Sequence, residues 1–405
     1  WVGFSSSGDG GATWSDHGSL GDPNSYGYPA LIWRRADGHF YLATLHASGL
    51  GLWDLGTNCL TAGWVEMIHT GVADDKEMLA VDNNPSSPYY GRLYAVWTNL
   101  TDGHIYAVYS DDGGQTWSAP VDVSGHNQVN GAWPAVDPVT GDVYVAWTHW
   151  DVYPDGPIDV EIARSTDGGA TWTPRTNPMD NRVNPRDATA TANCGRPALN
   201  GDIGYNPYPQ IAVDHHSNLH IVYSYDPDSY NSGDVVNIYY RRSTDGGATW
   251  ESQIRVNDYY WADQFSPALA VAENDVVAVF WYDRRLDPTN MAYDRYMALS
   301  RDGGLSFEAN KRISDASSPV VPAGPGMATC YHGDYDGATA GGGAFYTVWG
   351  DDRRGDADVW SDSEPYFWGR LFGTVYDATT MRGIANARVV ASYTVPKRRP
   401  QKYGT

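Results

Sequence analysis

The sequence predicts an all-β protein, a β-propeller of seven four-stranded antiparallel blades, with six blades as the alternative. Three observations predict this fold: a composition rich in glycine and aromatic residues, a turn motif that recurs along the chain, and a strand pattern before each copy. The chain of 405 residues holds 44 Gly, 17 Trp and 29 Tyr. Aromatic residues favour strands and glycines favour tight turns, so this composition is typical of many short strands.

The turn motif combines Ser, Asp, two Gly, Ser or Thr, and a final Trp or Phe. It occurs at residues 7–14, 110–117, 165–172, 243–250 and, more loosely, 300–307. Aspartate in such a turn can accept hydrogen bonds from the turn's own amides, and the glycines can adopt positive φ. We therefore expect a structural role for the five aspartates, Asp9, Asp112, Asp167, Asp245 and Asp302. The wider gap after the first copy predicts a degenerate copy within residues 51–64.

The strand starts determine the number of blades. Innermost strands are predicted to start near six residues, Tyr28, Met78, Trp133, Tyr208, Ser266 and Tyr335. Residues 1–14 add an outer strand and a turn motif without the two inner strands, which predicts a seventh, incomplete blade. In the six-bladed alternative, this N-terminal piece completes the last blade. Residues 357–361 already supply a third strand there, which favours seven.

The chain divides into two regions near residue 363. Residues 1–363 carry the blade pattern, and residues 364–405 depart from it. Within the second region, residues 369–377 and 384–390 resemble the opening strands of the small β-sandwich known as the carboxypeptidase regulatory-like domain. This resemblance implies a linker and a partial β-sandwich over residues 364–405, and we expect both ends of the sequence to be cut.

The charge balance argues against two classes of partner. The chain carries 49 acidic and 27 basic residues, a net charge of -22, which repels nucleic acid and anionic membrane surfaces. No apolar run approaches the roughly 20 residues that span a bilayer, so no membrane insertion is expected. The cysteines, Cys59, Cys194 and Cys330, allow one disulfide, and the sequence leaves its pairing open.

Strand topology predicts where a site lies. In an antiparallel blade, the start of the innermost strand and the end of the second strand share one face, the mouth, and the turn motifs lie on the other. Ligands of propellers commonly bind over the central channel at the mouth. The mouth collects the candidate site residues, which are Asp75, Lys76, Trp150, Tyr282, Arg284, Arg285, His332, Asp334, Arg353 and Arg354.

Two Asp-Arg-Arg runs are the most informative polar feature of the mouth. They are residues 283–285 and 352–354. Paired arginines can bind a carboxylate or a sulfate bidentately, so these runs fit an acidic sugar. Alternatively, they tie adjacent blades together through ion pairs.

No cofactor is expected to be required. The acid-rich residues 151–159 and 226–234 offer oxygen ligands for a structural calcium ion, and a solvated acidic loop is the alternative because neither has EF-hand spacing. The insertion at residues 178–204 is long enough for a lid or for a contact with other surface proteins, and it could equally be decoration.

The five turn motifs, known as Asp-boxes, and the strand patterns resemble the sialidase superfamily with its bacterial neuraminidase repeats over about residues 1–363. More narrowly, residues 75–77, 281–285, 333–337 and 348–353 are similar to sialidase-like exported bacterial proteins. This resemblance implies a secreted or cell-surface protein directed at glycans.

Sialidases hold a substrate carboxylate with three arginines and use a Tyr-Glu nucleophile and an Asp acid/base catalyst. By this resemblance Arg284 and Arg353 match two of the arginines, and Asp75 or Asp334 matches the acid. Tyr282 is a further catalytic candidate, and the Tyr-Glu pair is not matched to particular residues. The first arginine lies in a Phe/Tyr-Arg-Ile-Pro motif, but residues 26–31 have only its aromatic residue and proline. We therefore expect either a glycoside hydrolase acting on acidic sugars or a non-catalytic surface propeller for adhesion, assembly or protein binding.

Overall fold

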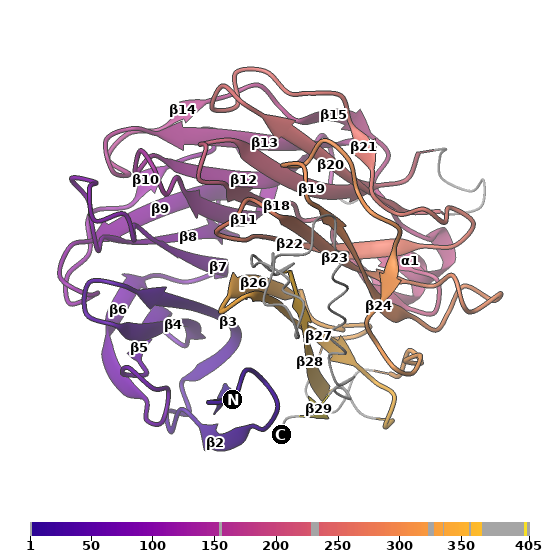
Figure 1. Cartoon of the computed structure of the whole chain (residues 1–405), viewed down its shortest axis with the longest axis horizontal. Helices are drawn as coiled ribbons and strands as arrows, with labels where there is room; N and C mark the ends of the chain where they lie inside the picture. The colour runs from indigo at the N-terminus through magenta and orange to yellow at the C-terminus, as the bar shows by residue number, and fades with distance from the viewer. Residues whose placement is uncertain are drawn as a thin grey trace, which may run out of the picture.

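Six four-stranded antiparallel sheets surround a central axis in the computed structural model (Figure 1). The structure describes residues 2–153, 156–227, 235–322, 328–334, 336–355 and 358–366, and the backbone of residues 401–402. The innermost strands of neighbouring sheets pack around the axis, and each sheet continues outward through its second, third and fourth strands.

The first three blades follow one another along the chain. The first blade holds β3 (Ser25–Arg34), β4 (His39–His46), β5 (Gly49–Asp54) and β6 (Gly63–Thr70). The second holds β7 (Asp74–Val81), β8 (Leu93–Asn99), β9 (His104–Ser110) and β10 (Val121–Asp122). The third holds β11 (Val129–Val136), β12 (Val143–Trp150), β13 (Ile158–Ser165) and β14 (Thr173–Pro174), and β15 (Met179–Arg182) also pairs with β13.

The other three blades repeat this order. The fourth blade holds β18 (Gln210–Val213), β19 (Leu219–Tyr225), β20 (Asn237–Ser243) and β21 (Ile254–Arg255). The fifth holds β22 (Gln264–Val271), β23 (Val277–Asp283), β24 (Asp294–Ser300) and β25 (Lys311–Arg312). The sixth holds β26 (Gly337–Gly341), β27 (Ala344–Asp351), β28 (Asp358–Pro365) and β29 (Gln401–Lys402).

The blade count agrees with the alternative of six and does not support seven. The N-terminal strands β1 (Gly3–Ser6) and β2 (Ser15–Ser19) form a separate two-stranded sheet, and β29 supplies the fourth strand of the sixth blade. The six-bladed alternative expected the N-terminal hairpin to complete the last blade. The structure shows instead that this hairpin forms its own sheet. Its apolar ends, Val2 and Leu20, pack against Leu42, Trp53 and Leu55 of the first blade. The predicted β-sandwich falls largely on residues 367–400, which lie outside the described part of the chain.

The hydrophobic core lies between adjacent sheets. The second strands of the second to fifth blades are buried on both faces, so they read as nearly continuous apolar runs, such as Val143 to Trp147 in β12. Tyr144 and Ala146 of the third blade pack against Leu219 and Ile221 of the fourth. Burial on both faces explains why apolar and aromatic residues dominate each second strand.

The Asp-boxes have the same hydrogen bonds in five places. In one of them Ser165 Oγ accepts the Gly169 amide at 2.8 Å, and Asp167 accepts both the amide and the hydroxyl of Thr171 at 2.9 and 2.6 Å. The equivalent bonds recur around the other four box aspartates, Asp9, Asp112, Asp245 and Asp302. Because these carboxylates bond within their own turns, they shape the connection between the third and fourth strands in the second to fifth blades and the turn between β1 and β2.

The strand registers place the Asp-boxes opposite the mouth. In the second blade, Asp74 pairs with Asn99 and Asn99 with His104 at one end of the sheet. Leu93 pairs with Ser110, the first residue of the box, at the other end. The start of β7 is therefore on the face away from the box.

The insertion between the third and fourth blades folds against the sixth-blade segment. It holds α1 (Ala188–Cys194), which is capped by Asp187 and Gly195, and the short pair β16 (Ala198–Leu199) and β17 (Ile203–Gly204). Cys194 forms a disulfide with Cys330, and Cys59 is a free cysteine. No helix in the described part of the chain is long and apolar enough to span a membrane.

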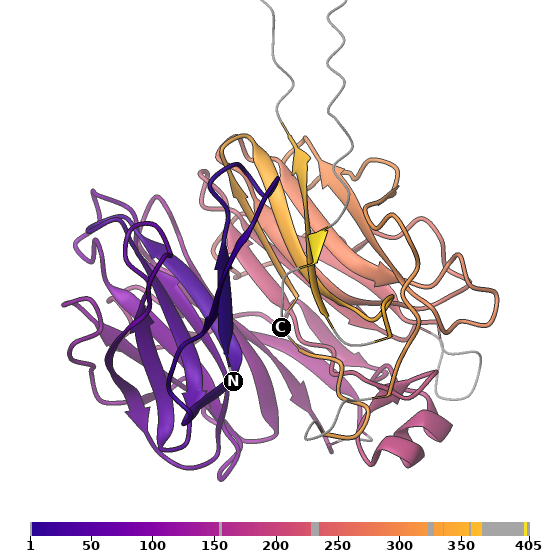
Figure 2. The same ribbon diagram turned by 90° about the horizontal axis from the view of Figure 1, so that it is seen from below.

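A cleft of about 460 Å³ separates the first and sixth blades. Figure 2 shows the N-terminal hairpin lying between these blades. Residues from β3, β26, β27 and β28 line the cleft, and they include Leu31, Tyr346 and Val348. The ring is thus less tightly packed here than between its other blades.

Candidate functional site

Four innermost strands carry an irregularity at the mouth. The register shifts within β3, β7, β11 and β22. Each shift contains a residue with positive φ, and these are Tyr28, Lys76, Gly131 and Ser266. Bulges re-aim side chains, and they are common beside functional sites. Lys76 and Ser266 both line the pocket on the axis as a result.

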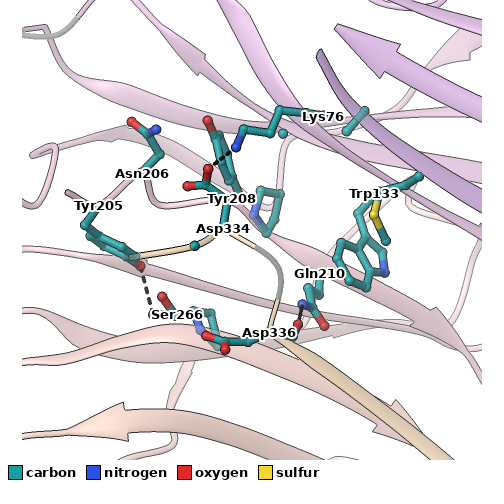
Figure 3. Close-up of a pocket in the computed structure, with 15 residues that line it drawn as sticks. Lys76, Trp133, Tyr205, Asn206, Tyr208, Gln210, Ser266, Asp334 and Asp336 are labelled. Atoms are coloured by element: carbon teal, nitrogen blue, oxygen red, sulfur yellow. Dashed lines mark hydrogen bonds and ion pairs between the residues drawn. The ribbon is translucent and has the colours of Figure 1, made fainter. Parts of the chain in front are cut away.

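A small pocket of about 40 Å³ opens at the mouth (Figure 3). Tyr205, Tyr208 and Trp133 supply aromatic walls, and Lys76 and Asp334 supply its charged pair. These residues come from the second, third and fourth blades and from the segment before the sixth, so the site needs the closed ring. Aromatic walls beside charged groups can stack on sugar rings while polar groups fix their hydroxyls.

An ion pair between Lys76 and Asp334 crosses the pocket. Both side chains are mostly buried, and the Lys76 ammonium lies 4.2 Å from the ring centre of Tyr28 and 5.5 Å from that of Tyr208. Burial alone would lower the pKa of Lys76, but Asp334 and Asp75 outweigh it and raise this pKa. The lysine is therefore charged, and it lies against the carboxyl group of Asp334.

Asp75, next to Lys76 on β7, does not line the pocket, and its surroundings differ from those of Asp334. Burial raises the pKa of Asp75, and the nearby charge of Asp334 adds to this effect against the opposing pull of Lys76. Burial and Asp334 likewise raise the pKa values of Tyr208 and Tyr331. The mouth thus combines a carboxyl group with a raised pKa, a second carboxyl group paired with a lysine, and two phenols with raised pKa values.

Gly131 is expected to be essential for the position of Tyr208. A Cβ on Gly131 would collide with the ring of Tyr208.

 The φ of Gly131 itself is 75°, a left-handed value that side chains rarely adopt. Gly131→Ala should therefore displace the Tyr208 ring and weaken glycan binding at least tenfold, as titration calorimetry would measure. Gly125→Ala, which has open space around it, is the matched control, and equal affinities of the two variants would contradict this role.

The Asp-Arg-Arg runs lie within the blades. Arg284 is fully buried and donates to Asp263 at 3.0 Å, while Arg285 donates to Asp283 and Asp258. Arg353 donates to Asp351 at 2.6 Å. None of these arginines lines the pocket at the mouth. The geometry therefore favours structural ion pairs as their role over the binding of an acidic sugar.

The arginines that occupy equivalent positions in the two blades have different places in the two runs: one is the last residue of the first run, and the other is the middle residue of the second. Trp281 and Arg285 both bond Asp283, and in the sixth blade Trp349 and Arg353 both bond Asp351. Arg353 thus corresponds to Arg285 in position. Arg354 is exposed and lies over the Trp360 ring, 5.4 Å from its centre.

Three other candidates lie behind the pocket. The Tyr282 hydroxyl donates to Asp336 at 2.7 Å, and burial raises the pKa of this phenol well above its ordinary value. His332 bonds the Tyr293 hydroxyl at 2.6 Å, and burial lowers its pKa to about 4. Trp150 is buried and packs edge-on against Tyr208. These side chains support the pocket wall and do not line the pocket.

Sequence reasoning missed two residues beside the mouth, Arg196 and Tyr331. The Arg196 guanidinium lies 6.0 Å from the Tyr331 ring centre, and its charge acts on Asp75. The insertion brings Arg196 here because the disulfide from Cys194 to Cys330 joins it to the segment that carries Asp334. The sequence signal for this region was the length of the insertion, which is long enough for a lid or for a contact with other proteins.

Removing this disulfide is expected to destabilise the protein and to loosen the mouth. The bond joins residues 136 apart in sequence, so the unfolded chain gains entropy without it. Replacing Cys194 and Cys330 by serine should lower the free energy of unfolding by about 2–5 kcal/mol in a urea titration. Cys59→Ser is the control, and the prediction is wrong if both proteins unfold at the same urea concentration.

Among the residues that the structure describes, two groups of side chains could hold a metal ion. His149, Asp151 and Asp159 place ligand atoms within 4.8 Å of one another, as do Asp214, His216 and Asp275. The first group overlaps the acid-rich stretch at residues 151–159. The other stretch, residues 226–234, lies mostly outside the described residues, so calcium there stays a prediction.

Comparisons with known proteins agree with this architecture. The BNR/Asp-box repeat matches residues 108–119. No curated protein matches the sequence. The chain is therefore an Asp-box β-propeller by both its repeat and its sheets.

Solved structures share the fold at low sequence identity. A protein of unknown function from Dyadobacter fermentans matches with a TM-score of 0.50 and 11% identity, over 84% of this chain and 95% of that one. A Hadza microbial sialidase matches with a TM-score of 0.47 and 16% identity, over 80% of this chain and 63% of its own. A polysaccharide lyase, an ulvan lyase, matches with a TM-score of 0.49 and 10% identity, over 84% and 82% of the two chains. At these identities the comparisons show the fold alone.

Proposed function

We propose that the mouth binds a glycan and cleaves a glycosidic bond, with Asp75 as the acid and Asp334 as the base. One observation carries this proposal: two neighbouring carboxyl groups have opposite surroundings. Burial raises the pKa of Asp75, whereas Asp334 forms an ion pair with Lys76. Carboxyl pairs whose environments separate their protonation states are typical of acid/base catalysis.

The proposed reaction is a hydrolysis. Asp75 gives its proton to the glycosidic oxygen as the bond from that oxygen to the anomeric carbon breaks. A water molecule forms the new bond to the anomeric carbon and gives a proton to the Asp334 carboxylate. Proton exchange with solvent then returns both groups to their starting states.

The walls of the pocket support sugar binding. Tyr205, Tyr208 and Trp133 present ring surfaces, and Asn206 and Gln210 supply amide groups beside them (Figure 3). Gln210 already donates to the Asp336 backbone carbonyl at 2.9 Å, which fixes its side chain. A sugar could thus stack on a ring while its hydroxyls bond neutral donors and acceptors.

The rate of this reaction should depend on pH in a defined direction. Asp75 acts only while protonated, so kcat/KM should fall as the pH rises through the pKa of Asp75. Because burial raises this pKa, the alkaline limb should lie above the ordinary range for aspartate. A pH-rate profile on any cleaved glycan checks this, and a rate that stays constant from pH 4 to pH 8 would rule out Asp75 as the acid.

A non-catalytic glycan-binding propeller is the second candidate function. The observation that favours it is the Lys76 to Asp334 ion pair, which occupies the small pocket. Turnover assays on a panel of glycans, run beside binding assays, separate the candidates: binding without any turnover supports the second. In either case we propose a secreted or cell-surface location, supported by the disulfide between Cys194 and Cys330.

A further inference from the structure

Two adjacent aromatic side chains, Tyr260 and Trp261, are exposed beside the mouth, outside its pocket. Tyr260 is 43% exposed and Trp261 is 71% exposed, the highest value for a tryptophan among the described residues. Their ring centres lie 4.7 Å apart. Single apolar residues are common on protein surfaces, but two large rings in contact expose a contiguous apolar surface that can bind a partner. We call these two residues the aromatic pair.

The strand directions place the aromatic pair on the mouth face. Residues 256–263 connect β21, the outermost strand of the fourth blade, to β22, the innermost strand of the fifth. Gln264, the first residue of β22, pairs with Asp283 at the mouth end of β23. Trp261 precedes Ser266, which lines the pocket, by five residues, so their Cα atoms are at most about 18 Å apart. One glycan chain can therefore contact both the pocket and Trp261.

Buried hydrogen bonds hold the loop that carries the aromatic pair. Asn257 is 1% exposed, and its side chain donates to the Tyr259 carbonyl oxygen at 2.6 Å and to Gln264 Oε1 at 2.8 Å. The Arg255 guanidinium lies 4.6 Å from the ring centre of Tyr260. A surface that is already ordered loses little conformational entropy on binding. The loop thus presents the two rings in a preorganised arrangement.

The size of the aromatic pair favours a glycan over a protein as its partner. Two aromatic side chains offer at most about 500 Å² of contact area. Each partner in a stable protein interface buries roughly 800 Å². A sugar ring is much smaller, and its C–H groups can pack on an aromatic ring while its hydroxyls stay hydrated.

We propose that the aromatic pair is a second sugar-binding subsite, which holds the part of a glycan chain that extends out of the pocket. The inference rests on the proposed glycan site at the mouth. It also names the substrate class of that site, which is a polysaccharide or a long oligosaccharide and not a disaccharide.

Titration calorimetry with glycans of two lengths tests this subsite. The probes are a disaccharide and an octasaccharide of hyaluronan and of arabinan, an acidic and a neutral glycan. We expect the wild type to bind the octasaccharide of at least one glycan more tightly than its disaccharide. Trp261→Ala should lower this octasaccharide affinity about fivefold and leave the disaccharide affinity unchanged, because only the longer chain reaches the ring.

Two further variants accompany Trp261→Ala. Trp33 is 45% exposed and lies on β3 beside the turn on the Asp-box face, so Trp33→Ala is the matched control and should leave both affinities unchanged. Trp261→Phe keeps an aromatic ring and should retain most of the octasaccharide affinity.

The outcomes separate this inference from the proposed function. Equal octasaccharide affinity in the wild type and Trp261→Ala would overturn the subsite and leave the proposed function intact. The same conclusion would follow if the wild type bound both chain lengths equally, or if Trp261→Ala weakened both by the same factor. If neither glycan binds at either length, the proposed function and the subsite fall together.

Discussion

Asp75→Asn is expected to lower the turnover of a cleaved glycan by about 10²–10⁴-fold, because the variant cannot give a proton to the leaving oxygen. Asparagine keeps the size and polarity of the side chain, so the dissociation constant for the glycan should change little. Initial rates and titration calorimetry on the same oligosaccharide measure the two quantities. A large fall in kcat with unchanged binding is the signature of a lost catalytic group.

The matched control for this variant is Asp151→Asn, on the same face of the propeller. Asp151 is exposed, whereas Asp75 is half-buried and interacts with the charges of Lys76 and Asp334, so replacing Asp151 should leave kcat within about twofold. If Asp75→Asn keeps wild-type turnover, or if both variants lose it equally, Asp75 is not the acid of this site.

Arg284→Ala is expected to have the largest effect on stability. Arg284 is fully buried and pairs with Asp263, which is also buried, so alanine leaves a carboxylate without its cation. Breaking a buried pair in this way costs about 3–5 kcal/mol. Urea unfolding followed by tryptophan fluorescence should show this loss.

An exposed pair provides the comparison for Arg284. Arg301 bonds Glu308 at 2.7 Å near the surface, where side-chain ion pairs contribute about 0–1 kcal/mol. Arg301→Ala should therefore unfold close to the wild-type urea concentration. If Arg284→Ala is equally stable and instead binds glycans more weakly, Arg284 is a substrate ligand, as the resemblance to sialidases implied.

The repeats made the architecture predictable from the sequence. The Asp-boxes recur in the second to fifth blades and in the N-terminal hairpin, and apolar second strands recur along the chain, so all-β structure, four-stranded sheets and the opposite placement of boxes and mouth could be predicted. The number of blades was harder, because residues 1–14 carry a box without the inner strands of a blade. Only the three-dimensional packing shows that this hairpin forms its own sheet and packs against the first blade.

The site was predictable in its location and less so in its members. Lys76 and Asp334 were correctly placed at the mouth, but the positive φ at Lys76 that accompanies the strand irregularity has no signal in residue type. The arginines of the Asp-Arg-Arg runs were expected there too, whereas Arg284 is buried by neighbours that are distant in sequence. Arg196 reaches the mouth through a disulfide whose pairing three cysteines leave open.

The most direct test of a glycan site at the mouth is a crystal structure of Asp75→Asn soaked with an oligosaccharide that the protein binds. We predict sugar density over the axis, in contact with Tyr208 and within hydrogen-bond distance of Asp334. Density on the Asp-box face or in the cleft between the first and sixth blades, with an empty mouth, would contradict the proposed site.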